Sequence, residues 1–118
     1  MSDEFLKIAT AEINDEISEI QNILNFCHSS LDVSANAAKL QKSTHKIKGL
    51  APMMGKEEVG RLSSLLDSVL KKIMDGAITD EIFESLIDAV DEMKNSMTNS
   101  NYNLDKIKQR ISKILSTH

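Results

Sequence analysis

The stretch 56–74, KEEVGRLSSLLDSVLKKIM, decides the fold class of this chain. Its apolar residues recur every three or four positions, which is the spacing of one face of an α-helix. They are Val59, Leu62, Leu65, Leu66, Val69, Leu70 and Ile73. The turn-forming pair Asp75 and Gly76 then ends the pattern. The stretch therefore predicts an amphipathic helix that buries one face.

Two similar patterns precede this stretch. The first covers 3–31, and its apolar positions are Leu6, Ala9, Ile13, Ile17, Ile20, Leu24, Cys27 and Leu31. The second covers 34–54, with an inward stripe of Val33, Ala37, Leu40, Thr44, Ile47, Ala51 and Met54. Gly55 suits the end of this second helix. Pro52 cannot donate to the carbonyl of Lys48, so we expect a kink there.

Two more helical patterns follow, over 79–97 and 104–115. Thr79 opens the first of them, with acidic residues in the first turn, where the helix dipole favours them. Short connections favour antiparallel neighbours. We therefore expect an all-α domain over 1–118: an antiparallel four-helix bundle with an additional C-terminal fifth helix.

Composition excludes several classes of protein. The chain has 118 residues and a net charge of −4, a poor match for nucleic-acid backbones. The first residues are acidic, unlike the start of a signal peptide. No apolar run is long enough to span a membrane. The single cysteine, Cys27, cannot form an internal disulfide, and we expect it in the core. We expect a cytoplasmic protein that is monomeric as an isolated domain.

The segment His45-Lys46-Ile47-Lys48-Gly49 carries the chemistry. On a helix His45, Lys48 and Gly49 share a face, one step off the apolar stripe. A neutral imidazole is a competent nucleophile near pH 7. Lys48 places a positive charge beside it, and Gly49 leaves room for another molecule at a helix cost of about 0.5–1 kcal/mol. These features suit a phosphoryl acceptor, since a transferred phosphoryl group needs cationic neighbours.

This segment, followed by Met53-Met54-Gly55 and a new amphipathic helix, resembles the H-x-x-K-G…G pattern of histidine phosphotransfer domains. The likeness covers nearly all of the chain and is greatest to the N-terminal domain of chemotaxis histidine kinases of the CheA type. The resemblance implies that His45 is phosphorylated, with Lys48 supporting the phosphoryl group and Gly49 giving clearance. It also implies a carboxylate on the next helix, at Asp67, that holds one imidazole tautomer.

The chain departs from the family pattern at four positions. Asp67 stands where glutamate is usual and is one methylene shorter, which leaves its reach to His45 open. Ser64 replaces a second histidine that chemotaxis kinases often carry, and Lys56 replaces a frequent aromatic residue. Pro52 lies within the second helix pattern.

The sequence is compatible with two functions. One is a phosphoryl carrier that accepts phosphate from a histidine kinase catalytic domain and passes it to an aspartate of a response-regulator receiver domain. The chain has no glycine-rich nucleotide loop, so it is a phosphoacceptor, and the CheA-like pattern favours a piece of a kinase over a freestanding shuttle. We expect no cofactor or metal on the chain itself, with ATP and magnesium on partner domains. The alternative is a degenerate relative that docks a signalling partner without chemistry.

Overall fold

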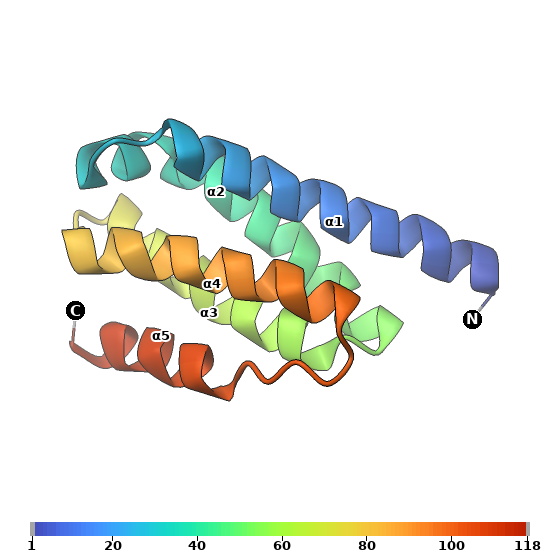
Figure 1. Cartoon of the computed structure of the whole chain (residues 1–118). Coiled ribbons are helices and arrows are strands. Elements are labelled where there is room, and N and C mark those ends of the chain that lie inside the picture. Colours follow the sequence, from blue (N-terminus) through green and yellow to red (C-terminus); the bar gives the residue numbers. More distant parts are fainter. Residues whose placement is uncertain (1, 118) are drawn as a thin grey trace.

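The computed structural model describes residues 2–117, and every regular element in that range is helical. The elements are α1 (Asp3–Phe26), α2 (Ser30–Leu50), the short 3₁₀ helix η1 (Pro52–Met54), α3 (Glu57–Met74), α4 (Asp80–Thr98) and α5 (Asp105–Thr117). Successive α-helices run in opposite directions (Figure 1). The predicted all-α bundle with a fifth helix is thus confirmed. Within residues 2–117, no helix combines the length and the apolar character that crossing a membrane requires.

The core lies between α1, α2, α3 and α4, and α2 packs most extensively on α3. Its largest fully buried side chains include Ile13, Ile17, Leu40, Ile47, Leu62, Leu66, Leu70, Ile73 and Met93. The fifth helix covers α3 and α4 with a short apolar stripe of Ile107, Ile111 and Ile114. In Figure 1 the N-terminal end of α1 extends beyond the other helices.

The turn between α1 and α2 comes earlier than the apolar spacing predicts. The first helix ends at Phe26, not at residue 31, and α2 begins at Ser30, not at residue 34. Ser29 caps α2 by accepting a hydrogen bond from the backbone N–H of Asp32, whose carboxylate accepts one from the N–H of His28. The prediction that Leu31 faces inward on the first helix is therefore wrong, and its side chain is exposed.

The end of α2 also differs from the prediction. Instead of continuing through Met54 with a kink, α2 ends at Leu50, and Pro52 begins η1. Proline lacks the N–H that another helical turn needs, so the chain tightens into i→i+3 bonds. Gly55 then adopts a left-handed φ of 77°, which confirms its predicted place at the end of the element.

Two lysines tie the later helices to the α2–α3 unit. Lys56, where the family pattern often has an aromatic residue, donates from Nζ to the carbonyl of Ser96 in the last turn of α4. Lys72 donates from Nζ to the carbonyl of Leu115 near the end of α5, at 2.8 Å. A cation at a helix C-terminus satisfies free carbonyls and complements the helix dipole.

Candidate functional site

The side chain of His45 projects from the C-terminal half of α2 into solvent. Thr44 and Ile47 beside it are buried, and they fix the face of α2 that meets the core. A residue one step from Thr44 is rotated by about 100° around the helix. The His45 side chain is accordingly 74% exposed. An imidazole in this position is open to a second macromolecule.

Asp67 of α3 lies against this imidazole. Its side chain is only 15% exposed, and its Oδ2 is 3.8 Å from Nδ1 of His45. The separation is that of an ion pair and is longer than a hydrogen bond. The other carboxylate oxygen, Oδ1, accepts a hydrogen bond of 2.9 Å from the hydroxyl of Thr44. The shorter aspartate therefore faces His45 without forming a hydrogen bond to it.

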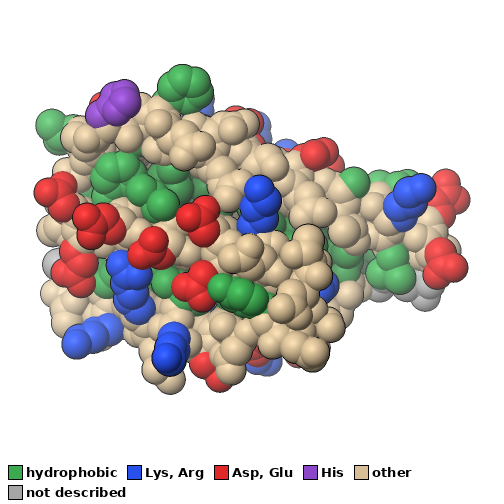
Figure 2. Space-filling model, viewed as in Figure 1, with side chains coloured by type: hydrophobic (Ala, Val, Ile, Leu, Met, Phe, Trp, Pro, Cys, Tyr) green, Lys and Arg blue, Asp and Glu red, His purple; other side chains and the backbone are tan. Residues whose placement is uncertain are grey.

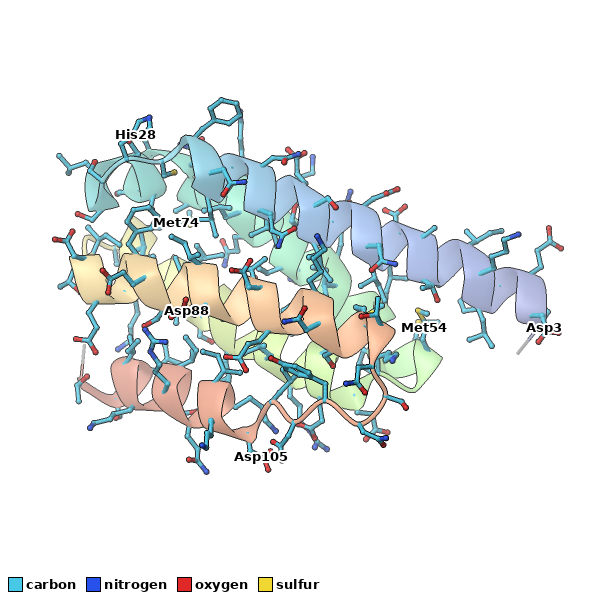
Figure 3. The ribbon with its side chains drawn as sticks, in the orientation of Figure 1. Asp3, His28, Met54, Met74, Asp88 and Asp105 are labelled. Carbon is cyan, nitrogen blue, oxygen red and sulfur yellow. The ribbon has the colours of Figure 1, made fainter. Side chains whose placement is uncertain are left out.

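An open depression between α2 and α3 surrounds the pair. It is lined by Ala38, Gln41, Lys42, His45 and Lys46 from α2 and by Asp67, Lys71, Met74 and Asp75 from α3 and its end. Figure 3 labels Met74 at the end of α3. Lys46 also pairs with Glu16 of α1 at 3.3 Å. The lining of the depression thus combines one imidazole with lysine and aspartate side chains.

Lys42 and Lys71 are candidate site residues that the sequence reasoning missed. Their spacing carried the signal: Lys42 is three residues before His45, and Lys71 is four residues after Asp67. Side chains at these separations share a helix face. Both lysines line the depression around His45.

Lys48 and Gly49 lie on the other side of His45, one turn further along α2, and do not line this depression. Both are exposed. A Cβ built on Gly49 would have no neighbour within 4 Å outside its own helix turn. A close helix–helix contact therefore does not explain this glycine, and the space beside it is open.

Ser64 occupies the position at which the family pattern often has a second histidine. It faces a part of the surface different from the depression around His45. It lines a groove between α3 and α5 together with Arg61, Asp105 and Lys108. Ser64 is therefore not part of the lining around His45.

Charge is distributed unevenly over the bundle. Acidic side chains gather over the half of α4 nearest its N-terminus in Figure 2, and α4 carries Asp80, Glu81, Glu84, Asp88, Asp91 and Glu92. In contrast, α2 carries Lys39, Lys42, Lys46 and Lys48 against one acid, Asp32. Around His45 itself, three lysines (Lys42, Lys46 and Lys71) line the depression together with the carboxylates of Asp67 and Asp75.

Comparisons with known proteins give one match. No curated protein and no solved structure is similar enough to this chain to count as a match. The sequence profile of the Hpt domain matches residues 4–96, which cover α1 to most of α4 and include His45. The chain therefore belongs to the Hpt domain family, whose members transfer phosphoryl groups in two-component signalling.

Proposed function

We propose that this chain is the phosphoacceptor domain of a chemotaxis-type two-component pathway. His45 accepts a phosphoryl group from ATP held by a histidine kinase catalytic domain and passes it to an aspartate of a response-regulator receiver domain. The observation that carries the proposal is the exposed His45 imidazole with the Asp67 carboxylate 3.8 Å from its Nδ1. The Hpt match over residues 4–96 supports the same chemistry.

The geometry suggests which nitrogen attacks. A carboxylate beside Nδ1 favours the tautomer that carries its proton there, so the lone pair of Nε2 is free. Nε2 attacks the γ-phosphorus, a new N–P bond forms, and the P–O bond to ADP breaks with its electron pair leaving on ADP. In the second transfer the aspartate oxygen of the receiver attacks phosphorus, and the N–P bond returns its electrons to the imidazole.

Lysines around His45 support the charged group. Lys42 and Lys71 line its depression, and Lys48 adds a cation one helical turn beyond His45. Positive side chains stabilise charge on the equatorial oxygens during phosphoryl transfer. The open space at Gly49 gives a partner domain room to approach.

Nucleotide chemistry belongs to the partner. ATP and magnesium are bound by the kinase domain, and this chain holds neither. We place the domain within a kinase of the CheA type rather than in a freestanding shuttle, on the motif around His45. We also propose a cytoplasmic location, where ATP is available to the kinase domain.

Labelling tests the proposal. The protein is incubated with γ-labelled ATP and the catalytic domain of a chemotaxis-type kinase. The matched control for His45→Gln is His28→Gln, since His28 is also exposed but lies at the α1–α2 turn (Figure 3). We expect alkali-stable, acid-labile label in wild type and in His28→Gln and none in His45→Gln. Absence of label on folded wild-type protein would instead favour a domain that docks a partner without chemistry.

A further inference from the structure

Thr44 is a polar residue in an apolar setting. Its side chain is 1% exposed and belongs to the stripe with which α2 meets the core. It lines a small internal space together with the apolar residues Ile20, Leu24, Leu40, Leu66, Leu70, Leu86 and Val90. A buried hydroxyl costs stability unless it makes a hydrogen bond. Valine has nearly the same shape and would fill this position without that cost.

The hydroxyl of Thr44 has a specific partner. It is 2.9 Å from Oδ1 of Asp67 and 3.1 Å from the carbonyl oxygen of Gln41. A hydroxyl group has one proton to donate, and the carboxylate is the stronger of these two acceptors. The Thr44–Asp67 bond therefore joins α2 to α3 directly beneath the exposed imidazole.

This bond determines which way the carboxylate faces. With Oδ1 held by Thr44, the remaining oxygen, Oδ2, is the one that lies 3.8 Å from Nδ1 of His45. An aspartate has two side-chain torsions, and without the bond its carboxylate is free to rotate toward water. The hydroxyl thus restrains a carboxylate that is too short to be held by the imidazole alone.

We infer that Thr44 is a positioning residue for phosphoryl transfer, which orients Asp67 so that His45 keeps its proton on Nδ1 and attacks through Nε2. The inference rests on the proposed function of His45. Thr44 acts only through Asp67, because its side chain is buried and so is out of reach of a group attached to Nε2.

Two measurements on Thr44→Val, Thr44→Ser and wild type test this role. The first is the ¹⁵N NMR shift of each His45 nitrogen at a pH where the ring is neutral, which gives the fraction with the proton on Nδ1. The second is the initial rate of labelling by the kinase domain. We expect Thr44→Val to stay folded, to lose part of its Nδ1–H tautomer, and to be labelled about two- to tenfold more slowly.

Serine supplies the discriminating control. Thr44→Ser keeps the hydroxyl but removes a buried methyl group, so it should lower stability while it retains the wild-type tautomer. In an Asp67→Asn background, Thr44→Val should change the labelling rate no further. A wild-type tautomer population in Thr44→Val overturns the inference, whatever the rate. Failure of the kinase to label wild type would refute the proposed function instead, and the tautomer measurement would still stand.

Discussion

Gly60→Ala should destabilise the fold, although alanine is the better helix former. Gly60 lies in the first half of α3, where it is buried against the ring of Pro52. A Cβ at this position would lie 2.8 Å from Cγ and 3.0 Å from Cδ of Pro52. Carbon atoms in contact prefer about 3.5–4.0 Å, so the proline turn has to move. The contact sets how closely η1 packs on α3.

The magnitude follows from two opposing effects. Overpacking destabilises a fold by about 1–3 kcal/mol, and replacing a helical glycine with alanine stabilises the helix by about 0.5–1 kcal/mol. From the middle of each range, the net loss at Gly60 is about 1 kcal/mol in the free energy of unfolding. For a chain of this size that lowers Tm by about 2–8 °C. Urea unfolding followed by circular dichroism measures the loss.

A double-mutant cycle tests whether Pro52 is the cause. Pro52→Ala removes the ring carbons that the new Cβ would meet, so the two substitutions should couple favourably by about 1 kcal/mol or more. The matched control is Gly49→Ala, the same chemical change at a helical site with no neighbour within 4 Å. A Gly60→Ala protein as stable as wild type, or a cycle with no coupling, would refute the reasoning.

Three further predictions concern transfer, pH and thiol reactivity. Gly49→Ala should raise stability by up to about 1 kcal/mol yet slow labelling of His45, because its methyl group enters the space that a partner needs; faster labelling would contradict this role. The hydrogen bond from Lys108 keeps the pKa of Glu58 below its ordinary 4.5, so Glu58→Gln should be less stable than wild type above that pH. This difference should shrink in urea titrations as the pH falls further, and a constant difference would count against the pair. Burial, and secondarily the charge of Asp32, raises the pKa of the Cys27 thiol, so a disulfide reagent at pH 8 should react slowly with native protein and rapidly in urea; equal rates would show that the thiol is accessible.

Periodicity predicted the elements well because it reports burial, which is what a helical bundle requires. It failed where local hydrogen bonds decide an end. Leu31 continues the spacing of the first helix, yet the Ser29 cap starts α2 one residue before it. Pro52 was expected to kink a continuing helix, but the missing N–H and the left-handed Gly55 together stop it. The position at which a helix ends depends on such individual hydrogen bonds, and the spacing of apolar residues does not reveal them.

For the candidate site, too, the sequence predicted some features and not others. Helical spacing placed His45 outside the apolar stripe, and the structure finds it exposed. Spacing along one helix cannot give the distance between two, so the approach of Asp67 to His45 required the packing of α3 on α2. The contribution of Thr44 was hidden for another reason, since the sequence does not show which acceptor a buried hydroxyl meets.

Transfer to a receiver domain is the most direct test of His45 as a carrier. The chain is loaded with phosphoramidate, which phosphorylates imidazole without a kinase, and the excess reagent is removed. A receiver domain with Mg²⁺ is then added. Mass spectrometry of samples kept at alkaline pH then measures the phosphoryl group on each histidine. We predict rapid loss from His45 with matching gain on the receiver aspartate, while any group on His28 stays in place. A phosphoryl group that remains on His45 with every receiver tested, or that leaves His28 equally fast, would contradict the account.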